Sequence, residues 1–123
     1  MVDFKQKEKY DINDLLEIMR LLRAPGGCPW DAQQTHMSIR KNLIEETYEV
    51  IEAIDKDDKE LMTEELGDLL MQVVFHAQME QEAGNFDFGD VTDGVCKKLI
   101  ERHPHVFGEV EVSGVGDVLN NWD

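Results

Sequence analysis

The sequence predicts an all-α fold, and three observations lead to this prediction. Apolar residues recur at three- and four-residue steps over most of the chain, which is the spacing of amphipathic helices. Glycine and proline gather in short stretches between these periodic segments. No stretch alternates strongly enough to require a sheet, although residues 106–112, VFGEVEV, could pair briefly as a strand.

The first predicted helix covers residues 11–23, where six apolar residues share one face. It ends at the stretch APGGCPWD, in which Pro25 and the pair Gly26 and Gly27 favour a short loop. Asp31 or Thr35 would cap the second helix, because short polar side chains accept hydrogen bonds from free backbone N–H groups. The second helix should end at about residue 53 or 55.

The third predicted helix runs from residue 59 to about residue 82, after the polar break DKDD and before Gly84. A break this short predicts that the second and third helices are antiparallel neighbours. The fourth helix should begin at Phe88 or Asp90 and end at Arg102. Together these four helices predict a four-helix, bundle-like arrangement.

Apolar residues on two sides of the third helix predict self-association. One face carries Leu66, Leu70, Val73, Val74 and Ala77, and nearly the opposite side carries Met71 and Phe75. A helix that is apolar on both sides needs cover on both, which four short helices can hardly provide. We therefore expect a bundle completed by homo-oligomerisation, with Met71 and Phe75 at the seam.

Composition and charge limit the functions open to this chain. Its 123 residues are enough for one domain with a real core. A formal net charge of −15, from 27 acidic and 12 basic residues, disfavours general nucleic-acid binding, which depends on arrays of lysine and arginine. The apolar runs are too short for a membrane helix. Two unpaired cysteines and the absence of an apolar leader in MVDFKQKEKY predict a cytoplasmic protein.

Acidic residues are concentrated at residues 45–68, EETYEVIEAIDKDDKELMTEELGD, where eleven acids stand against two lysines. Glu46 and Glu49 are three apart on the second helix, and Glu65 and Asp68 are three apart on the third. Residues with this spacing are neighbours on a helix surface, so each pair can hold one ion. The short hairpin then allows the two pairs to face each other.

An ordinary solvated acidic face is the simpler interpretation, but the helical wheel places Glu46 and Glu65 at the edge of the core. Two like charges about 4 Å apart repel by about 4 kcal/mol at an effective dielectric constant of 20, so such a cluster needs a counterion. Carboxylate ligands favour the hard cations Mg²⁺, Mn²⁺ and Ca²⁺ over zinc. We expect Mg²⁺, with Mn²⁺ as a possible substitute, because it binds a few carboxylates together with substrate phosphates.

The segments EETYE and EELGD, with GCPWDAQQTH, GDLLMQVVFHAQM and ERHPHVFGEV, resemble the MazG family of all-α nucleoside triphosphate pyrophosphohydrolases. The resemblance extends over about residues 14–122. It implies Mg²⁺-dependent hydrolysis of ribo- or deoxyribonucleoside triphosphates, ordinary or modified, to the monophosphate and pyrophosphate. Glu46, Glu49, Glu65 and Asp68 would hold the metal, and Glu45 would bind it through water or orient the attacking water. The implied assembly is a homodimer or homotetramer.

Three further residues are candidates for substrate contacts. Lys98 and Arg102 share a face of the fourth helix and match family positions that contact phosphate, although a solvated basic stripe would have the same spacing. Trp30 could stack on a nucleobase or simply pack its loop onto the bundle. His103 and His105, on either side of Pro104, are expected to end the fourth helix and cap its carbonyl groups rather than bind metal.

We expect residues 1–123 to form a single MazG-like domain, with a core at about residues 11–105 and a C-terminal tail, residues 106–123, that would be truncated relative to the family pattern. The CPWD loop is typical of the first copy in family members with two such domains. Two alternatives remain open: a catalytically weak nucleotide-binding or dimerisation domain, and a carboxylate-lined metal buffer or helical scaffold. Metal-dependent turnover would favour the enzyme over the binding or dimerisation domain. Failure of any triphosphate to raise the melting temperature in Mg²⁺ would favour the metal buffer or scaffold.

Overall fold

The computed structural model describes residues 2–108, 114 and 116. It divides into two compact units, residues 1–85 and residues 86–123. The elements of the first unit are α1 (Ile12–Arg23), α2 (Pro29–Gln33), α3 (Arg40–Asp55) and α4 (Lys59–Glu82), and those of the second are α5 (Phe88–Glu101) and α6 (Pro104–Phe107). The described residues contain no strand, so the all-α prediction is confirmed.

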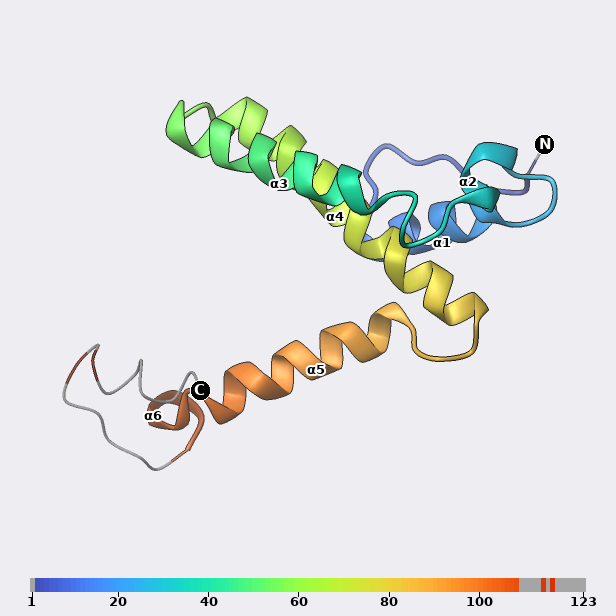
Figure 1. Cartoon of the computed structure of the whole chain (residues 1–123). Helices are drawn as coiled ribbons and strands as arrows, with labels where there is room; N and C mark the ends of the chain where they lie inside the picture. The colour runs from blue at the N-terminus through green and yellow to red at the C-terminus, as the bar shows by residue number, and fades with distance from the viewer. Residues whose placement is uncertain (1, 109–113, 115, 117–123) are drawn as a thin grey trace. The chain divides into compact units, whose positions relative to one another are not determined.

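The centre of the first unit is the antiparallel pair α3 and α4, which lie side by side in Figure 1. Their connection is short and polar: Asp57 takes a positive φ of 50°, and the Asp58 side chain accepts a hydrogen bond from the Leu61 N–H at 3.0 Å. Asp58 therefore caps α4 and fixes the hairpin. This pairing confirms the prediction drawn from the DKDD break.

Helix α1 packs against α4 and against the short helix α2. A capping box between Asp11 and Asp14 begins α1, because each side chain accepts a hydrogen bond from the backbone N–H of the other residue. The buried apolar core of this unit comes from α1, α3, α4 and the residue before α3: Met19, Ile39, Val50, Ala53, Val74, Phe75, Ala77 and Met79.

The segment between α1 and α3 differs from the prediction. It contains the five-residue helix α2, which has Pro29 at its first position, where the missing N–H costs nothing. Neither Asp31 nor Thr35 caps α3: Asp31 lies within α2, and α3 begins after Ile39 without a side-chain cap. Thr35 instead closes a turn with Ser38, whose Oγ accepts from the Thr35 N–H at 2.8 Å.

The apolar faces of the hairpin are only partly covered. On α4, Val74 and Ala77 are buried whereas Leu66, Leu70 and Val73 are exposed. On α3, four large apolar residues are also exposed: Ile44, Tyr48, Ile51 and Ile54. Met71 is exposed as well, but Phe75 is only 4% exposed, so placing Phe75 at an oligomer seam was wrong. Its ring packs within the chain, beneath the Arg23 guanidinium at 5.4 Å from the ring centroid.

In the second unit, α5 begins with a capping box between Asp87 and Asp90 and ends with Arg102 as its C-cap, as predicted. His103 Nδ1 lies 2.6 Å from the Leu99 carbonyl oxygen, which confirms that it caps a carbonyl of this helix. His105 does not do so: it lies inside α6, and its buried Nδ1 has no hydrogen-bond partner.

The strand considered at residues 106–112 is wrong for its first residues, because Val106 and Phe107 belong to α6. Residues 109–112 lie outside the described part of the chain. Among the described residues, no helix is both long enough and apolar enough to cross a bilayer.

Candidate metal centre

The predicted carboxylate cluster is present between α3 and α4. Glu46, Glu49, Glu65 and Asp68 each offer one oxygen atom, and these four atoms all lie within 4.8 Å of one another. Two features of the sequence cause this arrangement. The spacing of three residues puts each pair on one side of its helix, and the capped hairpin sets the register that brings the pairs together.

The cluster lies partly inside the helix pair. The Glu65 side chain is only 8% exposed, Glu46 and Asp68 are half-buried, and Glu49 is exposed. Burial of this kind removes the water that would otherwise stabilise the negative charges. Among the described residues, no lysine or arginine forms an ion pair with any of the four; Lys41 and Lys56 pair with the neighbouring Glu45 and Glu52.

The electrostatic result is a pair of carboxyl groups that resist ionisation. A hydrogen bond shared with Glu49, desolvation and repulsion from the other three carboxylates raise the pKa of Glu65 to about 7. Burial, followed by repulsion from Glu49, Asp68 and Glu45, also raises the pKa of Glu46. A cation placed among the four oxygens would offset both effects.

The residues fit a divalent cation that prefers oxygen ligands. All four donors are carboxylates, and two of their oxygens, Glu46 Oε2 and Glu65 Oε2, are buried without a hydrogen-bond partner. Buried acceptors without donors are costly, whereas coordination of a cation would use them. The absence of a histidine or cysteine from this cluster argues against zinc.

Glu45 stays outside the four-oxygen cluster. It is exposed and lies 3.7 Å from the Lys41 ammonium one turn earlier on α3. Direct coordination by Glu45 is therefore not part of this geometry, and its expected role through water remains a prediction.

Trp30 lies on α2 and is 55% exposed. Such exposure does not fit the interpretation in which the indole mainly packs its loop onto the bundle. Its backbone carbonyl accepts a hydrogen bond from Gln34 Nε2 at 2.8 Å, which helps to hold the short helix in shape. A partly exposed indole on a small, fixed helix is suited to stacking on a flat ligand.

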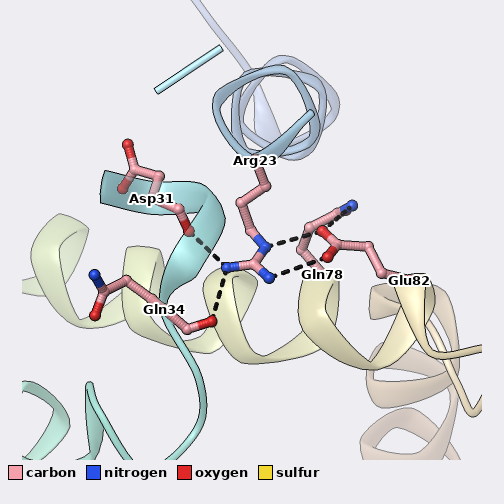
Figure 2. Close-up of polar contacts among 5 residues, drawn as sticks. All are labelled: Arg23, Asp31, Gln34, Gln78 and Glu82. Carbon is pink, nitrogen blue, oxygen red and sulfur yellow. Dashed lines mark hydrogen bonds and ion pairs between the residues drawn. The ribbon is translucent and has the colours of Figure 1, made fainter. Parts of the chain in front are cut away.

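One residue that holds α2 in place was not predicted from the sequence, and it is Arg23 at the end of α1. Figure 2 shows its guanidinium between α2 and α4. It donates to the carbonyl oxygens of Asp31 at 2.7 Å and Gln34 at 3.2 Å, and to both carboxylate oxygens of Glu82 at 2.9 and 3.0 Å. The hydrogen bonds from Arg23 to the Glu82 carboxylate lower the pKa of Glu82. The Arg23 side chain is only 7% exposed, so this network lies at the edge of the core.

A second unpredicted network joins the segment before α3 to α4. His36 Nδ1 lies 2.6 Å from His76 Nδ1, and His36 Nε2 lies 2.7 Å from Glu80 Oε1. Asn85 Nδ2 donates to the other Glu80 oxygen at 2.8 Å. The partners lie 40 and 44 residues apart in sequence, so spacing alone could not have revealed them.

Lys98 and Arg102 belong to the second unit, Lys98 in the last turn of α5 and Arg102 at its C-cap. Lys98 is exposed and Arg102 is half-buried. Their spacing of four residues keeps them near each other at this end of the helix, as predicted. Contact with phosphate remains a prediction for both.

Comparison with known proteins identifies the family and agrees with the all-α fold. Residues 34–107 match the profile of the MazG nucleotide pyrophosphohydrolase domain. A solved structure, that of a mazG-related protein from Thermotoga maritima, superposes with a TM-score of 0.72 at 28% identity and covers 90% of this chain and 95% of that one.

Three relatives show how far the similarity extends. A nucleoside triphosphate pyrophosphohydrolase/pyrophosphatase MazG of Thermotoga maritima is 56% identical over 96 residues, which are 78% of this chain and 38% of the relative. A nucleoside triphosphate pyrophosphohydrolase of Escherichia coli K12 is 50% identical over 113 residues, 91% of this chain and 43% of the relative.

The uncharacterised protein YabN of Bacillus subtilis is 48% identical over 114 residues, 93% of this chain and 23% of the relative. The chain thus spans less than half the length of each of these relatives. The family profile nevertheless covers more than half of this chain and includes all four clustered carboxylates. This chain therefore belongs to the MazG nucleotide pyrophosphohydrolase domain family.

Proposed function

We propose that this chain hydrolyses nucleoside triphosphates to the nucleoside monophosphate and pyrophosphate, with Mg²⁺ as cofactor and Mn²⁺ as a substitute. The observation that carries the proposal is the set of four carboxylate oxygens within 4.8 Å of one another, two of them on side chains with orphaned buried oxygens. Support also comes from the relatives named as nucleoside triphosphate pyrophosphohydrolases.

The proposed reaction cleaves the anhydride bond between the α- and β-phosphorus atoms. Water supplies the hydroxyl group of one product and the proton of the other, so the atoms balance without a further reactant. Glu46, Glu49, Glu65 and Asp68 would hold the cation. When bound, Mg²⁺ would screen the charge of the triphosphate and lower the pKa of a coordinated water. Glu45, exposed beside Glu46, would orient the attacking water and accept its proton.

Mg²⁺ is preferred because it binds proteins through a few carboxylates and completes its shell with water and substrate phosphates. Trp30 would stack on the nucleobase, since it is exposed on a helix that Arg23 fastens to the first unit. Lys98 and Arg102 would neutralise the phosphates, Arg102 through its planar fork and Lys98 as a point charge. The substrates include ribo- and deoxyribonucleotides, ordinary or modified.

We also propose that the chain works as a homodimer or homotetramer. The exposed apolar residues of α3 and α4 support this: Ile44, Tyr48, Ile51, Ile54, Leu66, Leu70, Met71 and Val73. An apolar surface of this kind on adjoining helices favours burial against another copy. The two free cysteines fit a reducing compartment, and we place the protein in the cytoplasm. We further propose that residues 1–123 form a single MazG-like domain.

The experiment that tests the function is product analysis. Purified chain is incubated with a panel of ribo- and deoxyribonucleoside triphosphates, with Mg²⁺, with Mn²⁺ and with EDTA, and pyrophosphate is measured separately from orthophosphate. Pyrophosphate and monophosphate in equal amounts, lost in EDTA, are the expected result. Nucleotide binding without turnover would instead assign the chain the role of a nucleotide-binding or dimerisation domain. Failure of any triphosphate to raise the melting temperature in Mg²⁺ would leave a metal-binding scaffold.

A further inference from the structure

Gln72 on α4 is a buried amide without a hydrogen-bond partner for its side-chain oxygen. The residue is 5% exposed, and its Oε1 atom makes no hydrogen bond in the described structure. Asp68 precedes it by one helical turn, which puts the two residues on the same side of α4. Burial of an unsatisfied amide carries a desolvation cost that a well-packed apolar residue would avoid.

The register of the hairpin relates Gln72 to the metal centre. We call two residues that face each other across α3 and α4 a level of the hairpin. Glu49 with Glu65 forms one level, and Glu46 with Asp68 forms the next. Counting one turn further in the same direction, toward the beginning of α3 and the end of α4, the register reaches Asn42 on α3 and Gln72 on α4. An amide level therefore follows directly on two carboxylate levels, about 6 Å farther along α4 at 1.5 Å per residue.

The unsatisfied oxygens follow the same order. Among the described residues, the buried side-chain oxygens without a hydrogen-bond partner are Glu65 Oε2, Glu46 Oε2 and Gln72 Oε1. They fall one on each of the three consecutive levels. All three can accept a hydrogen bond or coordinate a cation, and the protein supplies a donor to none of them. A common missing partner explains this pattern better than three separate defects.

A hydrated divalent cation has the chemistry of that partner. Mg²⁺ keeps several of its waters in protein sites, and each retained water donates hydrogen bonds outward. A neutral amide one turn beyond the carboxylates is a poor direct ligand beside four acids, but its oxygen is a good acceptor for such a water. Groups that contact a metal's ligands in this way orient them and contribute to metal affinity.

We infer that Gln72 is an outer-sphere positioning residue of the metal centre, whose Oε1 accepts a hydrogen bond from a hydration water of the bound cation. The inference rests on the proposed function, because it assumes that the carboxylates hold a metal. It assigns Gln72 no contact with the reacting atoms. Its effect is to fix a hydration water and thereby to favour a cation that keeps its hydration shell.

The decisive variant is Gln72→Met, which keeps the volume and removes the amide, and the matched control is Gln78→Met on the same helix. The Gln78 amide donates to Glu82 at 3.1 Å and lies away from the carboxylates in the sequence register. Mg²⁺ and Ca²⁺ dissociation constants are measured by titration calorimetry without nucleotide, and melting temperatures are measured in EDTA.

We expect Gln72→Met to weaken Mg²⁺ binding by roughly tenfold. Ca²⁺ binding should weaken less, because Ca²⁺ takes more of its ligands directly from protein oxygens. The melting temperature in EDTA should stay the same or rise, since an unsatisfied buried amide is gone. Gln78→Met should leave both metal affinities unchanged.

Unchanged Mg²⁺ affinity, or an equal loss for both cations with a lower melting temperature, would overturn the inference in favour of a packing role. Should Gln72→Met fail to fold, Gln72→Asn takes its place: it keeps the amide but draws the oxygen back by one methylene, and it must show the same selective loss.

The outcome is separable from that of the proposed function. A wild-type chain that binds Mg²⁺ without releasing pyrophosphate would end the proposed function and leave Gln72 testable by calorimetry. Pyrophosphate release with Mg²⁺ affinity independent of Gln72 would end this inference alone. A wild-type chain that binds no divalent cation would overturn both.

Discussion

His36 Nδ1 and His76 Nδ1 point directly at each other across 2.6 Å. The ring centroids are 4.9 Å apart and the planes differ by only 4°, which fits two rings lying edge to edge, with one N–H···N hydrogen bond, rather than face to face. Only one of the two nitrogens can carry a proton in this geometry. His36 Nε2 is at the same time fixed by Glu80 at 2.7 Å. The pair therefore cannot accept two positive charges and keep its contact.

This relationship predicts that acid weakens the first unit. Burial, and to a smaller extent the charge of His36, lowers the pKa of His76 below its ordinary value of 6.5. The unfolded chain therefore binds a proton at pH values where the folded chain resists it, and the His76 contribution to stability is lost as the pH falls below about 6.5. His76→Gln should lose less stability than wild type between pH 7 and pH 5, measured by urea denaturation in EDTA. An equal or larger loss in the variant would contradict this assignment.

Arg23 is expected to be the most sensitive residue of the α1–α2 region. Arg23→Met keeps much of the apolar stem but removes the guanidinium bonds to the Asp31 and Gln34 carbonyls and leaves Glu82 without its charged partner. Loss of such a partly buried network should lower the free energy of unfolding by roughly 2–4 kcal/mol. Arg23→Lys should recover only part of it, because an ammonium lacks the planar fork. Denaturation curves of the two variants test this order, and equal stability in both would contradict it.

Features that depend on local sequence were predictable, whereas contacts between residues far apart in the chain were not. Helices α1, α3, α4 and α5 follow from local periodicity and from glycine and proline breaks, and the carboxylate cluster follows from two acid pairs joined by a short hairpin. Helix α2 has only five residues, too few for a periodic pattern. Arg23 with Glu82 spans 59 residues and His36 with His76 spans 40, so their partners are set by tertiary packing. Phe75 was misplaced for the same reason, since Arg23 covers its ring.

Glu65 predicts a pH dependence of the opposite sign in the metal-free chain. Its carboxyl has a pKa of about 7, raised by the hydrogen bond with Glu49 and by desolvation, against 4.5 in the unfolded chain. Between these values the folded state binds the extra proton, so the Glu65 contribution to stability declines as the pH rises from about 4.5 to about 7. Glu65→Gln should remove this decline and should be more stable than wild type at pH 8 in EDTA. A variant with the same pH slope as wild type would show that Glu65 titrates normally.

The affinity for Mg²⁺ should also depend on the ionisation of the Glu65 carboxyl group. A carboxyl must lose its proton to coordinate Mg²⁺, so Mg²⁺ affinity should increase as the pH rises through about 7. Calorimetry at pH 7 in buffers of different ionisation enthalpy should detect release of a fraction of a proton on binding. Affinity that is flat from pH 6 to pH 8 would indicate that the carboxylates are already ionised.

Removal of one charge from the cluster should abolish turnover without unfolding the protein. Glu49→Gln and Asp68→Asn each keep the shape of the side chain but take one negative ligand from the four. Because like charges repel in the metal-free chain, melting temperatures in EDTA should rise or stay the same, whereas Mg²⁺ binding and pyrophosphate release should fall by at least about a hundredfold. Glu52→Gln is the matched control, since Glu52 pairs with Lys56 outside the cluster. Wild-type rates in either cluster variant would refute the site.

Trp30→Ala should separate nucleotide affinity from catalysis. The indole is 55% exposed, so its removal should change the melting temperature little. Loss of one stacking contact is worth about 1–3 kcal/mol, which corresponds to a KM increase of roughly 5- to 150-fold. The kcat should change far less, because the carboxylates are untouched. Trp30→Phe retains an aromatic face and should recover part of the affinity. Steady-state kinetics with one good substrate measure the split, and a variant that melts early with an unchanged KM would show instead that the indole serves to pack α2.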